Sequence, residues 1–338
     1  MPFSDLIFVF GNSRSGTTMM GRILNQSPRV WTCKHEIHFW GQIHSPKEQR
    51  LTEDQQLSYI QKLLRTQRDG YFSKKTLSSY EKRAKELIAS SPLDISDPAL
   101  LYYEFLRVEA KANGKDKYCD QTPRNLFYLD ELQSYYPDAK FINMVRDPRD
   151  VLLSQKYKWK RRFLGGKDSI PLSESIRSWA NYHPITISKI WKASIETSLK
   201  PNDIKVLHVK YESLIEKPDL VLQEVCDYLK IKYEPKMKEV PVVGSSAQRD
   251  LNLAKGLRKD NLNKWKKGGL SNTEIYLCEW ICKYQLGKFD YRKSDVRPNP
   301  IALFVYMILL PFQIGFSLVL NLTKNKNILD TIKRKLNK

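Results

Sequence analysis

A short loop near the amino terminus has residue types and spacing suited to binding an anion. Residues 11–18 (GNSRSGTT) follow an apolar run and precede a helix predicted over residues 19–25. Backbone N–H groups of such a loop, and of the helix that follows, bind phosphate-like groups. Nucleotide triphosphatases have a lysine after the second glycine, whereas this chain has Thr17, with Thr18 next and the cation at Arg14. The loop therefore predicts an anion cradle that lacks the lysine used in metal-assisted transfer of a γ-phosphoryl group.

A second candidate anion site follows another apolar run. Residues 139–145 (AKFINMV) predict a buried strand, and a helix is predicted from Pro148 onward, so Arg146 stands at the carboxyl end of the strand. A guanidinium is a planar, bidentate donor to phosphate. Ser154 lies about two helical turns further on and brings a hydroxyl to the same region. Arg146 and Ser154 thus predict a phosphate clamp, whereas Arg149 is interpreted as a surface or salt-bridging residue.

The two motifs together resemble those of the PAPS-dependent sulfotransferases, P-loop enzymes of the bacterial or Golgi type whose donor is 3′-phosphoadenosine 5′-phosphosulfate (PAPS). The 5′-phosphosulfate loop of that family reads Arg or Lys, Ser, Gly, Thr, Thr, and residues 14–18 of this chain read RSGTT. The resemblance implies that residues 14–18 bind the 5′-phosphosulfate and that Arg146 and Ser154 bind the 3′-phosphate. The predicted binding residues of the first group are Arg14, Ser15, Gly16, Thr17 and Thr18.

Three further segments extend the resemblance over most of residues 6–290. In residues 120–126 (DQTPRNL), Gln121 stands where the family usually has a lysine, so no cationic role is assigned there. Tyr211, in the stretch KYESL, corresponds to a tyrosine near the nucleotide, and Lys264 to a late phosphate contact. From the residues alone, a core tyrosine and a solvated lysine remain the alternatives.

The candidate base lies in residues 35–39 (HEIHF), which resemble a Glu-x-His-Phe stretch of bacterial and Golgi-type relatives. The base of the family is a Glu or His that faces the sulfuryl group. We predict Glu36 as the base and keep His38 in reserve; His35 as the base, or Glu36 as a mere helix cap, remain open. A base removes the acceptor proton, while Arg14 stabilises charge on the departing phosphate oxygen. This scheme needs no metal.

The elements that position these residues predict an α/β fold. Apolar runs at residues 6–10, 139–145 and 204–209 alternate with helical segments, as expected for a P-loop-type, three-layer α/β/α fold with a central parallel sheet. Residues 47–115 predict a helical insertion. Residues 172–199 predict a core-covering helix pair with a break at Pro184.

The carboxyl-terminal tail differs from the rest. Residues 301–322 contain no charged residue, have basic flanks and are long enough to span a bilayer core of about 20 residues. Pro311 near the middle favours a kinked, re-entrant or interfacial helix, and a buried helix that closes the domain is the alternative. We predict a sulfotransferase domain over residues 1–298 and a hydrophobic, basic-flanked tail over 299–338 that contacts an anionic membrane surface.

Composition limits the remaining choices. The net charge of +20 fits a nucleic-acid surface, an anionic membrane or a polyanionic small molecule. Five irregularly spaced cysteines predict neither a disulfide framework nor a zinc site, and the start of the chain has no signal-peptide pattern, so we expect a cytoplasmic protein, attached to the membrane by its tail. The rivals are a P-loop kinase, which needs a lysine at position 17, and a non-enzymatic basic protein. The expected partners are PAPS and an acceptor, guessed as a carbohydrate or lipid-linked glycan, with no nucleic acid.

Overall fold

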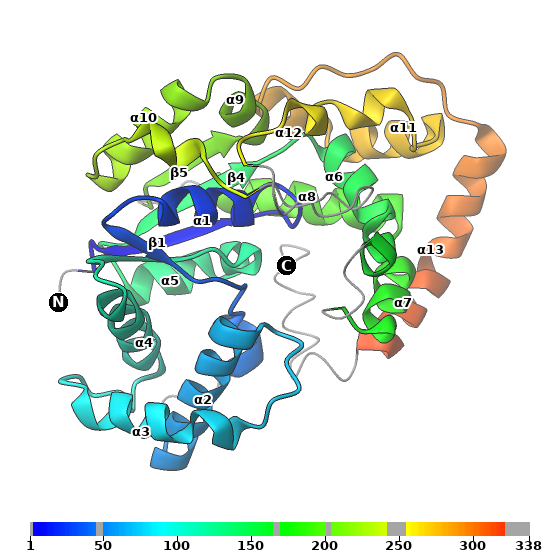
Figure 1. The fold of residues 1–338 in the computed structure, drawn as a ribbon. Coiled ribbons are helices and arrows are strands. Elements are labelled where there is room, and N and C mark those ends of the chain that lie inside the picture. Colours follow the sequence, from blue (N-terminus) through cyan, green and yellow to red (C-terminus); the bar gives the residue numbers. More distant parts are fainter. Residues whose placement is uncertain (1–2, 45–49, 165–169, 201–203, 242–254, 322–338) are drawn as a thin grey trace.

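A central parallel sheet of five strands organises the chain. The computed structural model describes residues 3–44, 50–164, 170–200, 204–241 and 255–321. The strand order is β2-β3-β1-β4-β5, and every neighbouring pair runs parallel (Figure 1). The strands are β1 Leu6–Gly11, β2 Val30–Thr32, β3 Lys117–Asp120, β4 Lys140–Val145 and β5 Val206–Lys210. The predicted strands are present, and β2 and β3 are two further strands that the sequence analysis missed.

Both faces of the sheet are covered, because alternate side chains of β1 enter different hydrophobic clusters. Phe8 and Phe10 pack into a cluster with the helices of residues 53–135, whereas Ile7 and Val9 pack with α1 and α10. The predicted three-layer α/β/α arrangement is therefore confirmed. The helices named so far, with those that complete the layers, are α1 Thr17–Asn25, α2 Glu53–Asp69, α3 Glu81–Ser90, α4 Pro98–Ala112, α5 Leu129–Tyr135, α9 Tyr211–Glu216 and α10 Pro218–Leu229.

A third cluster lies beyond the end of β4. Trp191 is its largest fully buried side chain and packs with residues of α6, α11 and α12. The Nε1 of Trp191 donates a hydrogen bond to the carbonyl oxygen of Arg146 at 2.9 Å, which fixes the backbone at the end of β4. The elements of this part are α6 Pro148–Lys156, α7 Leu172–Ala180, α8 Pro184–Ser198, α11 Asn272–Ile281 and α12 Lys283–Lys288.

The helix pair α7 and α8 breaks before Pro184, as predicted, but only α8 enters the core. Ile176 and Trp179 of α7 are 49% and 61% exposed, so the prediction that both helices cover the core is wrong for α7. Their spacing is helical, and the face that they form is turned away from the sheet. Apolar periodicity shows that a helix has an apolar face, but it does not say what covers that face.

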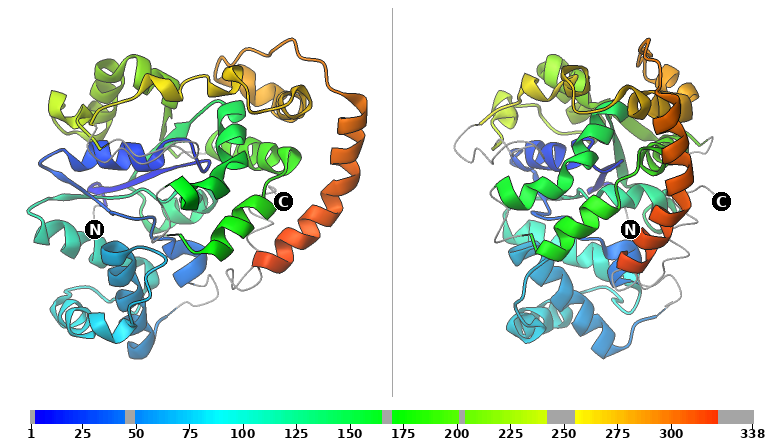
Figure 2. Two further views of the ribbon diagram at one scale, coloured as in Figure 1. Left: turned by 45° about the vertical axis from the view of Figure 1, so that its right-hand side comes forward. Right: turned by 90° about the vertical axis from the view of Figure 1, so that its right-hand side faces the viewer.

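The last described element, α13 Pro300–Asn321, is an unbroken helix that contains Pro311. None of its residues is buried, which overturns the alternative of a buried closing helix. Figure 2 shows α13 along the outer edge of the molecule beside α7. Its length and composition would allow it to cross a membrane. The boundary between domain and tail near residue 299 stays a prediction.

Candidate active site

The anion loop lies between the end of β1 and the start of α1, where the sequence places it. The backbone is left-handed at Arg14 (φ 76°) and Gly16 (φ 100°), and no side chain caps the first turn of α1. A Cβ atom on Gly16 would lie 2.7 Å from Cδ2 of Tyr211, so only glycine fits against that ring. The buried Oγ of Ser15 has no hydrogen-bond partner among the described residues. Backbone donors of this loop and of the start of α1 are therefore available to a bound anion.

Arg14 and Ser154, which the sequence analysis assigned to different phosphates, are in direct contact. The Nε of Arg14 donates a hydrogen bond to Oγ of Ser154 at 3.0 Å. Burial, together with the charges of Arg161 and Arg146, lowers the pKa of Arg14 to about 10. A cation held among other cations is stabilised by an anion, so this part of the site is suited to a multiply charged ligand.

Arg146 lies at the carboxyl end of β4 and connects three segments. Its Nη1 donates to the carbonyl oxygen of Arg14 at 3.2 Å, and its Nη2 donates to that of Asn261 at 2.7 Å. Its guanidinium stacks on the Tyr211 ring, with Cζ 4.4 Å from the ring centroid. Its buried Nε has no partner among the described residues. Arg146 thus holds the loop before Lys264 against the anion loop and keeps one donor for a ligand.

Arg149 is buried and belongs to the structure below the site. It donates two hydrogen bonds to Asp147, at 2.9 and 2.7 Å, and one to Glu279 at 2.7 Å. Its Cζ lies 3.9 Å from the ring centroid of Trp265. The salt-bridging interpretation of Arg149 therefore agrees with its contacts, while the surface interpretation is wrong.

Tyr211 and Lys264 also line the cavity. Tyr211 is the first residue of α9 and is buried, and Lys264 begins the short 3-10 helix Lys264–Lys267. Burial, together with the charge of Arg146, lowers the pKa of Lys264. The structure therefore brings Tyr211, Lys264 and Arg146 together. Tyr211 and Lys264 come from segments of the sequence far from the anion loop.

Glu36 and His38 form a pair on the other side of the anion loop. The Nε2 of His38 lies 3.2 Å from Oε2 of Glu36, and the Glu36 side chain is 40% exposed. Burial alone would raise the pKa of Glu36, but the contact with His38 and the charges of Lys158 and Arg124 lower it below its ordinary value of 4.5. A carboxylate at neutral pH can accept a proton, as a general base must. His35 lies in the same cavity wall.

The segment after β3 positions this pair. The backbone N–H of Ile37 donates to Oγ1 of Thr122 at 3.0 Å, and Thr122 in turn donates to buried Asp120 at 2.6 Å. Asp120 also accepts a hydrogen bond from Tyr102 at 2.7 Å. Gln121, where the family usually has lysine, is buried and brings no charge. The role of this segment here is to fix the backbone between Glu36 and His38.

Three cations near Glu36 or Arg14 were missed by the sequence analysis. Lys158 and Arg161 lie in the 3-10 helix Lys158–Leu164, and Arg124 follows the Thr-Pro step after β3. Burial and the charge of Arg14 lower the pKa of Lys158 to about 8, against the opposing effect of Glu36. The signal that could have identified Lys158 and Arg161 was the basic run directly after α6, the helix that carries Ser154.

One cavity of about 2210 Å³ contains these groups. Within the described residues, no group of three or more His, Cys, Asp or Glu is arranged to hold a metal ion; the metal-free scheme stays a prediction. Ser15 lies beneath the cavity wall rather than in it. The predicted site residues that line the cavity are Arg14, Gly16, Thr17, Thr18, His35, Glu36, His38, Arg146, Ser154, Tyr211 and Lys264.

Comparison with known families matches residues 5–235 to the model of the Sulfotransferase family. A putative protein-tyrosine sulfotransferase of Caenorhabditis briggsae is 25% identical over 237 residues, which cover 70% of this chain and 69% of that protein. An uncharacterized protein of Aquifex aeolicus (strain VF5) is 22% identical over 273 residues, or 79% of this chain. The nodulation protein NoeE of Sinorhizobium fredii is 22% identical over 66% of this chain. The chain spans 31% of the Aquifex protein and 49% of NoeE.

Two solved structures share the fold. The sulfotransferase domain from the curacin biosynthetic pathway superposes with a TM-score of 0.54 at 16% identity, covering 85% of this chain and 98% of that domain. The sulfotransferase domain of the Synechococcus PCC 7002 olefin synthase gives a TM-score of 0.52 at 17% identity, with 86% and 95% covered. At these identities the likeness shows the fold alone.

Proposed function

The chain belongs to the sulfotransferase family, and we propose that it transfers a sulfuryl group from PAPS to a hydroxyl or amine of an acceptor. The observation that carries this proposal is the contact between Arg14 of the anion loop and Ser154 of α6, with Arg146 beside them. The contact joins the two halves of the predicted donor site into one basic pocket. No lysine of the triphosphatase type stands in the loop.

The donor fits the polar groups of the pocket. The loop amides, the hydroxyl groups of Thr17 and Thr18 and the first turn of α1 would receive the 5′-phosphosulfate. The free Nε of Arg146 and the hydroxyl of Ser154 would receive the 3′-phosphate, with Lys264 nearby. A 3′-phosphate distinguishes PAPS from ATP. In the resemblance described above, Arg146 and Ser154 correspond to the residues that bind this 3′-phosphate.

Glu36 and His38 would act on the acceptor. As the acceptor oxygen bonds to sulfur, its proton passes to the Glu36 carboxylate, and the bond between sulfur and the bridging oxygen of the 5′-phosphate breaks. The electron pair of that bond stays on the phosphate, giving 3′,5′-bisphosphoadenosine (PAP) and a sulfate ester. His38 lies 3.2 Å from Glu36 and would hold the carboxylate in place or replace it as the base.

Arg14 and Lys158 would stabilise the leaving group. Negative charge grows on the bridging oxygen as the sulfuryl group departs, and cations that the protein holds in place stabilise it more strongly than water does. Lys158, whose pKa is lowered to about 8, is also able to give a proton to that oxygen. Lys158 would thus supply the positive charge that Gln121 lacks.

The test is a comparison of ligands by thermal shift. PAP should raise the melting temperature more than ATP with Mg²⁺ does at the same concentration, because ligands that bind only the native state stabilise it. Stabilisation by ATP with Mg²⁺ and none by PAP would contradict the proposal and favour the kinase. Stabilisation by neither would remove the support for any nucleotide enzyme.

A further inference from the structure

Helix α13 is attached to the body by a polar stripe and by hydrogen bonds of the backbone carbonyls of Leu320 and Tyr306 with Arg177 and His183. Gln313, Ser317 and Asn321 are four residues apart, so they lie along one side of the helix. Gln313 donates a hydrogen bond to the carbonyl oxygen of Ala180 at 3.0 Å, and Ser317 and Asn321 donate to Oδ1 of Asn181 at 2.5 and 2.9 Å. These three polar side chains of α13 thus form hydrogen bonds with the end of α7.

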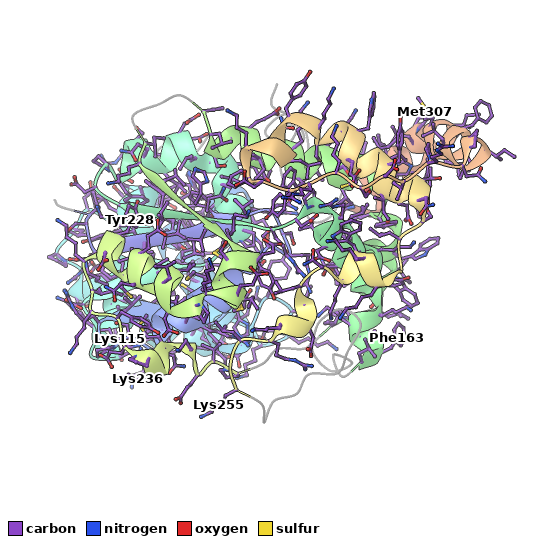
Figure 3. The ribbon with its side chains drawn as sticks, turned by 90° about the horizontal axis from the view of Figure 1, so that it is seen from above. Lys115, Phe163, Tyr228, Lys236, Lys255 and Met307 are labelled. Atoms are coloured by element: carbon purple, nitrogen blue, oxygen red, sulfur yellow. The ribbon has the colours of Figure 1, made fainter. Side chains whose placement is uncertain are left out.

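The opposite side of α13 is apolar and exposed. An 18-residue window of the helix has a mean hydropathy of 2.2, and none of its residues is fully buried. Figure 3 shows Met307 at the outer edge, at the end of the molecule opposite Lys115 and Lys236. The large exposed apolar residues of α13, most of them on this side, are Ile301, Phe304, Val305, Met307, Ile308, Leu309, Phe312, Ile314, Phe316 and Val319.

The exposed side of α7 continues this surface. Leu172, Ile176 and Trp179 are separated by four and three residues, so they share one side of the helix, and they are 53%, 49% and 61% exposed. Both views in Figure 2 show α7 and α13 side by side. We call these three residues and the exposed apolar residues of α13 the apolar face. Large apolar residues exposed together on two neighbouring helices mark an interaction site.

The basic residues next to the apolar face indicate that this face contacts an anionic membrane. Arg292, Lys293 and Arg297 are exposed directly before α13, and the sequence continues after it with Lys324 and Lys326. A second copy of this chain, which carries a net charge of +20, would bring like charges together. Basic groups beside an apolar surface are attracted to anionic lipid headgroups.

The apolar face runs into the mouth of the active-site cavity. Leu172 and Ile314 are large exposed residues of this face, and both also line the cavity that contains Arg14 and Glu36. A molecule whose tail lies in the bilayer can therefore enter the cavity with its headgroup first. Tyr71, which is 38% exposed, lines the same cavity.

Resting on the proposed sulfotransferase activity, we propose that α13 lies parallel to the membrane surface, with the apolar face in the interfacial layer. The acceptor is then a membrane lipid whose headgroup carries a hydroxyl group. A spanning α13 would have to leave the body and place the polar stripe of Gln313, Ser317 and Asn321 in hydrocarbon without partners. The parallel orientation keeps all of these hydrogen bonds.

Vesicle binding by the full chain tests the surface. We expect cosedimentation with vesicles of phosphatidylcholine and phosphatidylglycerol, and at least about tenfold weaker binding of Phe312→Glu. The matched control is Leu220→Glu on α10, because Leu220 is 68% exposed and Phe312 is 72% exposed. Equal loss in both variants, or a stable dimer in solution that does not bind vesicles, would overturn the proposal. PAP binding by the same samples reports on the donor site separately.

The orientation of α13 is tested by labels of known depth. The five cysteines are buried, so cysteines introduced at Phe304, Phe312 and Val319 can be labelled selectively with a fluorophore. Lipids with quenchers at two depths should place all three labels at the same shallow depth. A deep label at position 312 between shallow labels at 304 and 319 would show a spanning helix and overturn the parallel orientation.

The class of acceptor is tested with labelled PAPS and with one sugar headgroup, presented either on a lipid or in a soluble molecule. A glycosyl diacylglycerol in vesicles should be sulfated at least about tenfold faster than the corresponding soluble methyl glycoside, and Phe312→Glu should abolish the preference while Leu220→Glu keeps it. Faster sulfation of the soluble glycoside would contradict the lipid acceptor while leaving the enzyme assignment intact. Failure of both acceptors with intact PAP binding would also reject this lipid class, and loss of PAP binding would reject the function itself.

Discussion

Arg14 donates its Nε hydrogen bond to Oγ of Ser154 at 3.0 Å, so the loop after β1 is joined to the second turn of α6 before any ligand is bound. The two residues are 140 positions apart in the chain. A donor molecule would therefore meet a pocket whose two halves are already held together, which lowers the entropy cost of binding.

Removing this hydroxyl should weaken donor binding. Ser154→Ala should lower the PAP affinity by about 10-fold or more, since a hydrogen bond to a charged group contributes about 1.5–3 kcal/mol. Isothermal calorimetry measures the affinity. Ser90→Ala on α3, a part of the insertion outside the cavity lining, is the control and should bind PAP as the wild type does. Equal affinity of Ser154→Ala and wild type would contradict the role of Ser154.

Arg146 is better tested by lysine than by alanine, because its side chain also fastens the loop around Asn261. Arg146→Lys keeps the charge but loses the planar fork and the contact with Tyr211. We expect PAP binding to weaken by at least about tenfold with a small change in melting temperature. An unchanged affinity for PAP would show that Arg146 only positions the loop.

Glu36→Gln should retain PAP affinity and lose turnover by about 100-fold, since general-base catalysis contributes about that much. The pKa of Glu36 lies below its ordinary value, so the carboxylate is charged at neutral pH and kcat should fall only in acid, as the pH drops through that lowered pKa. Full activity of Glu36→Gln, with none in His38→Asn, would transfer the role to His38.

Donor binding should take up a proton at mildly alkaline pH. The pKa of Lys158 is about 8 without ligand, and the groups that face Lys158 are Arg14, Arg124, Arg161 and Glu36. A bound anion favours the charged form and raises this pKa, so at a pH of about 8.5 the protein gains a proton as PAP binds. Calorimetry in buffers of different ionisation enthalpy measures the uptake. Lys158→Arg should abolish it, and an uptake unchanged in that variant would reject the assignment.

Arg149 should matter for stability rather than for donor binding. Arg149→Met leaves Asp147 and Glu279 as buried charges without their main partner, which costs about 3–5 kcal/mol of unfolding free energy. Urea denaturation measures this loss, and Arg83→Met, which breaks the exposed pair with Glu86, should change stability by less than about 1 kcal/mol. A stable Arg149→Met that no longer binds PAP would make Arg149 a ligand.

The fold and the family were predictable from the sequence because their signals are local. β1 and β4 are strands of six mostly apolar residues, and the anion loop is continuous in the chain. β2 and β3 have only three and four residues and include polar ends, so no run marks them. The helix that became α7 was expected to cover the core because spacing identifies an apolar side of a helix but not its surroundings.

The arrangement of the site was less predictable, because it depends on contacts between distant segments. The sequence assigned Arg14 and Ser154 to opposite ends of the donor, and nothing in it reveals their hydrogen bond. Lys158 was missed because a basic run after a helix usually faces solvent. Its place near Glu36 follows from the direction in which α6 leaves the sheet.

The close approach of Gly16 and Tyr211 has a consequence for changing this protein. Any side chain at position 16 collides with the ring, and a smaller residue at position 211 removes the surface on which Arg146 stacks. Directed evolution that changes one position at a time would therefore disrupt this packing at each of the three positions. A library aimed at another donor nucleotide has to vary positions 16, 146 and 211 together.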